Sequence, residues 1–417
     1  MRILKLTSAV ESQLLESREA QDRTAHRVAE KIVRDIKRRG DTALNYWSRT
    51  LDALDLRNQG VWVSRKEMAA ARKGVPSDFL RAVAHAARNV RRVAEQQLPR
   101  PWSLQVEPGV QITQILRPID SIGCYIPGGR FALFSTLIMT VIPAQVAGVG
   151  RTIAVCPKPN LELLAAADFL GVQHLARIGG AQAIAALAYG TKQIARVEKI
   201  FGPGNRFVTA AKQIVSSDCA IDLPAGPTEA VVLARQGNAR WIAADLLAQA
   251  EHAPDAVSYL VTPSTHLAKA VQTEVATQLT SLPPSNPAHR SLQETGAILL
   301  TKNWDAAIAF VNRFAPEHLS LPESSSSLLE KIHSAGTIFI GSRSAQPFGD
   351  YASGSNHVLP TGGWARRRGG LSVNDFMKTI SVQTINRAGY LRLARDVQTM
   401  ARAEGLLAHA HAVEVRQ

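Results

Sequence analysis

The most constraining feature of this sequence is an alternation of short apolar segments with helical segments between about residue 119 and residue 341. Glycines follow several of the apolar segments, as at Gly128-Gly129, Gly179-Gly180 and Gly202. Strands that alternate with helices form parallel sheets, so we expect an α/β fold. Ligands of such sheets collect at the carboxyl ends of the strands. The expected strands are 121–126, 152–156, 174–178, 197–201, 230–234, 257–262, 297–300 and 337–341, and the expected helices are 135–147, 161–170, 181–188, 240–251, 267–280 and 304–314.

The two ends of the chain do not show this alternation of strands and helices. Residues 18–39 and 78–97 have helical periodicity, and prolines follow the second run. Residues 106–116 alternate between apolar and polar side chains, which predicts a hairpin. From about residue 375 to the end we expect helix.

The bulk properties are those of a globular enzyme. A chain of 417 residues predicts two or three structural units, and 46% hydrophobic and 20% charged residues are ordinary for this class. We find no apolar run of about 18 residues and no secretory signal at the N-terminus, so we expect no membrane span. Three widely spaced cysteines, Cys124, Cys156 and Cys219, favour a reducing cytoplasm over a disulfide framework.

The formal net charge of +14 raises the alternative of a nucleic-acid-binding protein. Much of the excess lies in the first hundred residues, where 21 Lys and Arg face 12 Asp and Glu, a difference of +9. In residues 31–39, however, Ile32, Val33 and Ile36 are interleaved with the charges at helical spacing, as on the wet side of an amphipathic helix. No stacking aromatics accompany them. We therefore expect no nucleic-acid partner.

The segment Asp245–His252 carries the first chemical signal. On a helix Gln249 and His252 rise from one face, because they are three residues apart. An amide oxygen and an imidazole could supply two ligands to Zn²⁺. A solvated pair would have the same spacing, so the motif alone leaves both interpretations open.

Further acids and imidazoles occur in the second half of the chain. Glu317 and His318 follow a proline in an expected loop, where they suit general-base work or form a surface pair. Asp350 and His357 flank a polar turn that could ligate a metal or lie in solvent. Glu404 and His409 are five apart, about 140° around a helix. On an uninterrupted helix they could not share one metal.

Nucleotide-binding loops are less explicit. The Gly148-Val-Gly150 sequence lacks the third glycine of a dinucleotide fingerprint and precedes a strand. The loops 125–129 and 202–205 are better candidates, although ordinary glycine turns would look the same.

Taken together, these stretches resemble the histidinol dehydrogenase family over nearly the full chain. The resemblance rests on eight motifs in the family's order. They are Tyr125-Ile-Pro-Gly-Gly, Gly179-Gly-Ala-Gln-Ala-Ile-Ala-Ala-Leu, Gly202-Pro-Gly-Asn, Ala225-Gly-Pro-Thr-Glu, Gln249-Ala-Glu-His, Ala315-Pro-Glu-His, Gly349-Asp-Tyr and Asn356-His-Val-Leu-Pro-Thr.

The resemblance implies an enzyme of histidine biosynthesis that oxidises L-histidinol to the aldehyde and then to L-histidine with two NAD⁺. His318 would take the alcohol proton, and Glu317 would activate the water that hydrates the aldehyde. One Zn²⁺ per subunit would be held by Gln249, His252, Asp350 and His409. The substrate would also contact Ser135, Thr228, His357 and Glu404, and NAD would be lined by Tyr125, Gln182 and Asn205.

The resemblance also implies a homodimer with two similar incomplete Rossmann-like domains and small terminal segments. We expect an N-terminal arm over 1–20, a first α/β domain from 21–123 and 227–371, and a second, NAD-binding domain over 124–226. The helical segment 372–417 would reach the partner subunit's site, which would allow Glu404 and His409 to approach it from different sides.

The sequence departs from the family's pattern at a few positions. Thr228 stands where Ser is common, Ala253 replaces a usual Gly, and residues 130–140 differ from many members. These departures concern substrate fit. The alternative is a related zinc and NAD dehydrogenase that acts on a sulfopropanediol-type alcohol.

Overall fold

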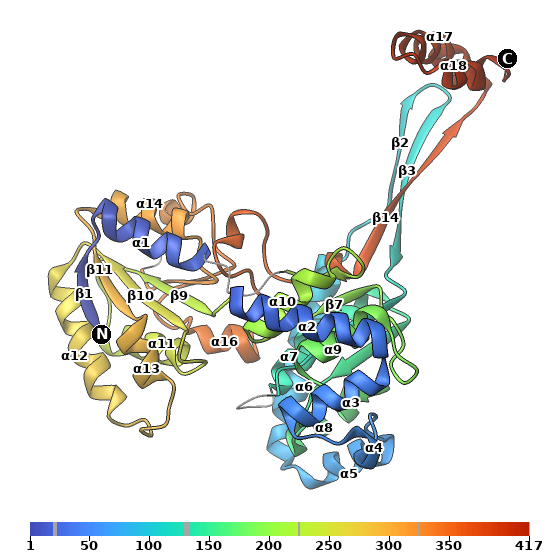
Figure 1. Cartoon of the computed structure of the whole chain (residues 1–417). Helices are drawn as coiled ribbons and strands as arrows, with labels where there is room; N and C mark the ends of the chain where they lie inside the picture. Colours follow the sequence, from blue (N-terminus) through green and yellow to red (C-terminus); the bar gives the residue numbers. More distant parts are fainter. Residues whose placement is uncertain (20–22, 129–132, 224–225, 324–325, 417) are drawn as a thin grey trace.

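The structure is a computed structural model that describes residues 1–417 except 20–22, 129–132, 224–225, 324–325 and 417. Two α/β lobes lie side by side, and a long arm projects from one of them (Figure 1). Parts of two sequence motifs, Gly129 and Ala225, fall outside the described residues, as does the departure at 130–132. Within the described chain no helix is long and apolar enough to cross a bilayer.

The first lobe contains a six-stranded parallel sheet in the order β1-β11-β10-β9-β12-β13. Helices α11, α12 and α13 pack on one face, and α1, α14 and α15 pack on the other. Because both faces are covered, the central strand β9 is buried throughout and is apolar after its first residue. The strands are β1 (Arg2–Lys5), β9 (Glu229–Leu233), β10 (Val257–Thr262), β11 (Ala297–Leu300), β12 (His318–Leu321) and β13 (Thr337–Ile340). The helices are α1 (Ser8–Glu19), α11 (Ala239–Ala250), α12 (Thr265–Leu279), α13 (Ala288–Glu294), α14 (Trp304–Phe314), α15 (Ser326–Leu329) and α16 (Gln346–Tyr351).

The second lobe contains a five-stranded parallel sheet in the order β6-β5-β4-β7-β8. Helices α5 to α8 pack on one face, and α2, α3, α9 and α10 pack on the other. The strands are β4 (Ser121–Tyr125), β5 (Arg151–Val155), β6 (His174–Ala176), β7 (Lys199–Phe201) and β8 (Ala220–Ile221). The helices are α2 (Arg23–Arg39), α3 (Asp41–Asp52), α4 (Leu56–Gln59), α5 (Arg65–Gly74), α6 (Ser77–Gln97), α7 (Phe134–Ala147), α8 (Leu161–Phe169), α9 (Gly180–Tyr189) and α10 (Arg206–Val215), with the 3₁₀ turn η2 (Val373–Phe376). The 3₁₀ turn η1 (Trp364–Arg366) contacts the first lobe, because Arg366 donates to the Arg313 carbonyl oxygen at 3.2 Å.

The arm is a three-stranded antiparallel sheet in the order β14-β3-β2. It is formed by β2 (Trp102–Glu107), β3 (Val110–Pro118) and β14 (Met377–Ile385). Helices α17 (Arg387–Ala403) and α18 (Leu407–Glu414) lie at its tip, far from both lobes (Figure 1). Every residue of β2 and every residue of β14 after the first is exposed, so in this single chain these two strands bury little of their surface.

The α/β class and the alternating elements predicted from sequence are confirmed. The basic segment 31–39 belongs to an amphipathic helix, as predicted. In α2 the side chains of Ile32, Val33 and Ile36 are buried. The hairpin prediction is also confirmed, although its strands extend to residues 102 and 118.

Four expectations differ from the structure, in which contacts between distant segments place these elements. The loop expected around Glu317 and His318 leads directly into strand β12. The helix expected from about residue 375 begins as strand β14, which pairs with β3. The helices between residues 23 and 97 pack on the second sheet, so they do not join residues 227–371 as expected. Residues 2–5, expected to form an arm, are an edge strand of the first sheet.

Candidate active site

Helix α11 ends at the candidate site with the predicted pair Gln249 and His252. Gln249 is buried, and its Nε2 donates to Thr228 Oγ1 at 2.6 Å. His252 lies just after the helix, which ends at Ala250, and its Nδ1 lies 3.0 Å from the carbonyl oxygen of Ala248. The tautomer that donates from Nδ1 leaves the Nε2 lone pair available to a ligand. The Gln249 oxygen Oε1 is likewise not used in the contact with Thr228.

Thr228, Glu317 and His318 meet where strands β9 and β12 begin. The two strands are parallel, with His318 opposite Ala230, so the residues that precede them lie side by side. Thr228 Oγ1 donates to Glu317 Oε2 at 2.5 Å, and the Glu229 amide donates to the same oxygen at 2.8 Å. His318 Nδ1 lies 3.2 Å from the Glu229 carbonyl oxygen. Both candidate catalytic residues are buried, so they are not a solvated surface pair.

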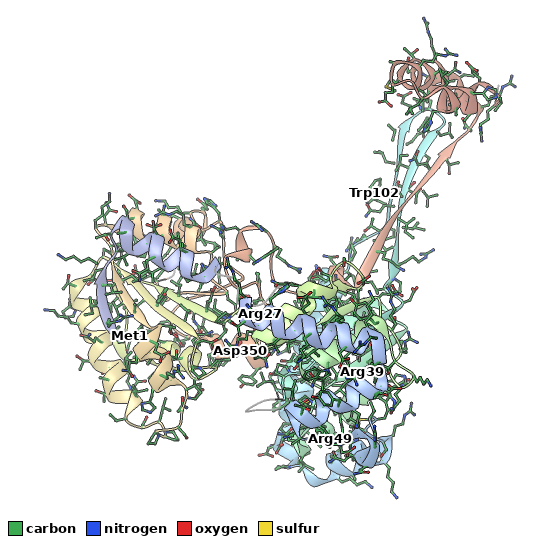
Figure 2. The ribbon with its side chains drawn as sticks, in the orientation of Figure 1. Met1, Arg27, Arg39, Arg49, Trp102 and Asp350 are labelled. Carbon is green, nitrogen blue, oxygen red and sulfur yellow. The ribbon has the colours of Figure 1, made fainter. Side chains whose placement is uncertain are left out.

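Asp350 lies in helix α16, between the two lobes (Figure 2). Its Oδ1 is 3.6 Å from His318 Nε2. His357 donates from Nδ1 to the Asp350 carbonyl oxygen at 2.8 Å, and its Nε2 lies 3.3 Å from Thr136 Oγ1. Thr136 and the neighbouring Ser135 are buried in the first turn of α7, in the second lobe. The His357 imidazole therefore connects the two lobes at the site.

The electrostatics of the site couple one imidazole to two carboxylates. Burial alone would lower the pKa of His318, but Glu317 and Asp350 outweigh burial and raise it to about 10. Burial would raise the pKa of Asp350, yet the imidazoles of His318, His357 and His252 hold it below its usual range. Burial lowers the pKa of His357. At neutral pH the chain alone therefore holds an ionised Asp350 beside a protonated His318.

The metal donors are incomplete within one chain. In the described part of the chain, no group of three or more His, Cys, Asp and Glu side chains could hold a metal ion. His252 acts electrostatically on Asp350, and Gln249 precedes His252 by three residues, so an imidazole nitrogen and a carboxylate lie near each other with an amide oxygen on the neighbouring helix end. That mixture of nitrogen and oxygen donors fits Zn²⁺ and leaves room for a fourth ligand.

The fourth predicted metal ligand, His409, and the predicted substrate contact Glu404 lie at the tip of the arm. Glu404 and His409 are exposed, and Figure 1 shows their helices α17 and α18 far from the lobes. The helix is interrupted between these two residues, so the objection that applied to an uninterrupted helix does not hold here. Gly405 has a φ of 77°, and the helix stops at Ala403 and restarts at Leu407.

In the second lobe, two of the predicted cofactor residues form a small polar cluster. Tyr125 Oη accepts a hydrogen bond from the Gly180 amide at 3.1 Å. Gln182 donates from Nε2 to Asp52 at 2.8 Å. Its Oε1 is buried and has no hydrogen-bond partner among the described residues. A buried acceptor without a donor fits a site that a ligand completes.

The third predicted cofactor residue, Asn205, caps helix α10. Its Oδ1 accepts from the amides of Phe207 at 3.0 Å and Val208 at 3.1 Å. The loop 202–205 lies against Tyr125, because a Cβ on Gly202 would come within 2.1 Å of the Tyr125 carbonyl oxygen. Gly202 also has a φ of 110°, so this position requires glycine.

Sequence reasoning missed a buried ion pair directly behind the site. Arg18 of α1 donates from Nε to Glu229 Oε1 at 2.7 Å, and its guanidinium lies 3.6 Å from the centre of the Phe314 ring. The Gly362 amide also donates to Glu229 Oε1, at 3.2 Å. Burial raises the pKa of Glu229, and Arg18 opposes that effect. Glu229 belongs to the Ala-Gly-Pro-Thr-Glu motif, but no local signal in the sequence pairs it with Arg18.

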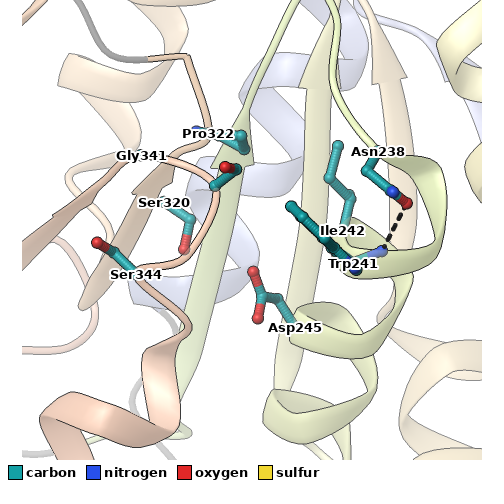
Figure 3. Close-up of a pocket in the computed structure, with 9 residues that line it drawn as sticks. Asn238, Trp241, Ile242, Asp245, Ser320, Pro322, Gly341 and Ser344 are labelled. Carbon is teal, nitrogen blue, oxygen red and sulfur yellow. Dashed lines mark hydrogen bonds between the residues drawn. The ribbon is translucent and has the colours of Figure 1, made fainter.

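A small cavity of about 20 Å³ lies beside Asp245, one helical turn before Gln249 (Figure 3). Ser320 of strand β12 and Trp241 of α11 also line it. It has room for about one water molecule, so it is no substrate pocket.

Comparison with known proteins agrees with this arrangement. The family model described as histidinol dehydrogenase matches residues 15–417. The histidinol dehydrogenase of Moorella thermoacetica is 44% identical over 407 residues, which cover 95% of each chain. That of Methanosarcina barkeri is 42% identical over 418 residues, which cover 98% of this chain and 96% of the relative.

A solved structure agrees as well. The crystal structure of histidinol dehydrogenase from Elizabethkingia anophelis superposes with a TM-score of 0.92 at 37% identity, and the match covers 100% of this chain and 98% of that one. The chain therefore belongs to the histidinol dehydrogenase family, the oxidoreductases of histidine biosynthesis.

Proposed function

We propose that this chain oxidises L-histidinol to L-histidine, through L-histidinaldehyde, in two successive NAD-dependent hydride transfers at a zinc-organised site. The observation that carries the proposal is the buried hydrogen-bond chain from Gln249 through Thr228 to Glu317, with His318 and Asp350 beside it. In this proposal His318 is the base, Glu317 is the carboxylate that activates water, and Asp350 is a metal donor.

His318 would act as the base that takes the alcohol proton. Its Nδ1 is held at the Glu229 carbonyl, which leaves Nε2 on the side of Asp350 as the acceptor. A base must be neutral, whereas the two facing carboxylates favour the imidazolium. A cation bound at Asp350 would cancel much of that effect and return His318 towards the neutral form.

Glu317 would activate the water that hydrates the aldehyde. Its Oε2 is fixed by Thr228 and by the Glu229 amide, so the carboxylate cannot rotate freely. A carboxylate held in this way is pre-organised to accept a proton from a water molecule. The methyl group that distinguishes Thr228 from the more common Ser does not prevent these contacts, because the hydroxyl bonds both Glu317 and Gln249.

Gln249, His252 and Asp350, with His409 of the partner subunit, would hold one Zn²⁺ per subunit. When bound, this ion supplies a fixed positive charge that orients the imidazole and amine of the substrate. Around it Ser135, Thr228 and His357, with Glu404 of the partner subunit, would contact the substrate.

Tyr125, Gln182 and Asn205 would line the NAD site, and NAD supplies the hydride acceptor. The unpartnered Gln182 oxygen and the close contact between Gly202 and Tyr125 support this assignment. Both lie at the glycine-rich ends of strands in a parallel sheet, where such ligands bind.

We infer a homodimer because a single chain leaves the arm unsupported. Leu391, Met400 and Leu407 near the tip are 69%, 61% and 69% exposed, and Leu104 on the arm is 55% exposed. Apolar exposure of this extent is typical of a surface that another subunit covers.

The three cysteines are free and buried, which supports a cytoplasmic location.

The test is a spectrophotometric assay of NADH formation with L-histidinol and NAD, combined with metal analysis of the purified protein. We expect two NADH for each histidinol consumed and about one zinc per chain. The same assay with sulfopropanediol tests the alternative enzyme class. Turnover of that diol, with none of histidinol, would overturn the proposal.

A further inference from the structure

A second buried ion pair lies behind the loop 202–205. Lys212 of α10 and Asp222, just after β8, form a salt bridge, although they are only 2% and 4% exposed. Removing two charges from water is costly, and such a pair is often no more stabilising than apolar side chains of similar size. Its position therefore calls for an explanation other than stability.

The pair binds both polar groups of the Gly202 backbone. Lys212 Nζ donates to the Gly202 carbonyl oxygen at 2.9 Å. The Gly202 amide donates to Asp222 Oδ2 at 2.7 Å. One residue thus has its amide and its carbonyl each fixed by an opposite charge, and that residue has a left-handed conformation and abuts Tyr125. Hydrogen bonds to charged groups are about twice as strong as neutral ones.

Asp222 also ties this loop to the segment that leads into the other lobe. Its Oδ1 accepts from the Leu223 amide at 2.6 Å, and its carbonyl oxygen accepts from Arg368. Arg368 in turn pairs with Asp375 at 2.9 Å. The chain continues from Leu223 to Thr228, whose hydroxyl binds Glu317. Asp222 therefore holds the cofactor-side loop and the start of the substrate-side segment at the same time.

We propose that Lys212 and Asp222 are positioning residues for dinucleotide binding: together they fix the Gly202 backbone so that the loop 202–205 receives NAD. This inference rests on the proposed function, because it assumes that the loop binds NAD. Neither side chain touches the cofactor. Their effect passes through the backbone of Gly202 and the cap at Asn205.

The experiment measures equilibrium binding of NADH by fluorescence, together with the KM values for NAD and for histidinol. The variants are Lys212→Met, Asp222→Asn and the double variant. Arg72→Met is the matched control, because it breaks the Arg72–Asp168 pair in the same lobe, away from the loop. Wild-type binding and turnover are measured first: a wild type that binds NADH but does not oxidise histidinol contradicts the proposed reaction and leaves the binding comparison intact.

We expect each single variant to weaken NADH binding and raise the KM for NAD about tenfold, the size of a lost hydrogen bond to a charged group. The KM for histidinol should change less than twofold. The double variant should regain thermal stability, because no charge is left unpaired, yet it should still bind NADH weakly, because the Gly202 carbonyl lacks its donor. Arg72→Met should match wild type.

Three results would overturn the inference. The first is NADH affinity within twofold of wild type in both single variants. The second is a parallel loss of NADH and histidinol affinity, which indicates general damage to the fold. The third is full recovery of NADH affinity in the double variant, since that would assign the effect to the unpaired charge and not to the hydrogen bonds.

Discussion

The buried pair Arg18–Glu229 allows a sharp test of how the first lobe supports its site. The change Arg18→Met removes the guanidinium and leaves Glu229 without its charged partner. The two side chains are 8% and 3% exposed, and Arg18 also lies on the Phe314 ring. Removal of one member of such a pair costs about 3–5 kcal/mol, because the remaining charge is left without compensation.

The chain offers a matched control that involves the same helix, α1. Arg313 of α14 pairs with Glu11 of α1, but these side chains are 51% and 17% exposed. An exposed pair contributes no more than about 1 kcal/mol, so Arg313→Met should change stability little. Urea unfolding followed by circular dichroism measures both variants under one condition. Equal losses in the two variants would refute the argument that burial sets the cost.

Activity adds a second measurement for Arg18→Met. The Glu229 amide and carbonyl hold Glu317 and His318, so displacement of Glu229 should lower kcat at a temperature where the variant is still folded. The double variant Arg18→Met with Glu229→Gln should recover part of the stability, because it leaves no buried charge. If kcat stays at the wild-type value while stability falls, the pair supports the fold alone.

Four further changes test the site and its supporting helix. With His318→Ala the first oxidation should slow by about 10²–10⁴-fold, the usual contribution of a positioned base, whereas Glu317→Gln should mainly slow the second oxidation. Supplied histidinaldehyde should restore part of the rate of NADH formation in the His318 variant but not in the Glu317 variant. The reverse pattern would exchange the roles of the two residues. Asp350→Asn should lower bound zinc, measured by metal analysis, and activity together, and unchanged zinc would contradict its role as a ligand. Burial raises the pKa of Asp245 to about 6 from an ordinary 3.8, so the folded protein favours the protonated acid. Asp245→Asn should therefore change stability little below pH 4, raise it progressively between about pH 4 and pH 6, and keep a constant gain of about 2 kcal/mol from there to pH 8, after allowance for partial exposure. A melting-temperature gain that is equal at pH 4 and pH 8 would count against it.

The sequence predicted those parts of the fold that local pattern determines. The parallel strands and covering helices are recognisable because burial on both faces gives continuous apolar runs, as in β9 and β10. Strand β14 was missed although 377–385 carries a local strand signal, the β-branched residues Thr379, Ile380, Val382, Thr384 and Ile385. The helix predicted for the C-terminal region was extended over this segment, and its partner β3 lies far away in the sequence. The grouping of the helices in 23–97 with the second sheet is likewise set by packing between distant segments.

For the candidate site, too, the sequence predicted local features but not the contacts between distant segments. Gln249 and His252 could be placed on one element from their spacing, but the contact of Gln249 with Thr228 needed the fold. Glu317 and His318 gave no local sign of burial, because their environment is made by β9, which lies about ninety residues earlier in the chain. The roles assigned to these residues came from the family resemblance, and they remain predictions that the assays above test.

Each lobe contains one buried ion pair beside candidate site residues. In each lobe an acid, Glu229 or Asp222, lies on a segment that carries candidate site residues, and a base from a neighbouring helix, Arg18 or Lys212, pairs with it. In the first lobe the backbone amide of Glu229 donates to Glu317, and in the second lobe the carboxylate of Asp222 accepts from the Gly202 amide. Apolar pairs would be at least as stabilising, but they could not direct an amide and a carbonyl at fixed angles. We therefore infer that both pairs are retained for the geometry of the backbone. This predicts that apolar replacement of either pair would leave the enzyme folded. Replacement of Arg18–Glu229 should impair the chemical step, and replacement of Lys212–Asp222 should impair cofactor binding.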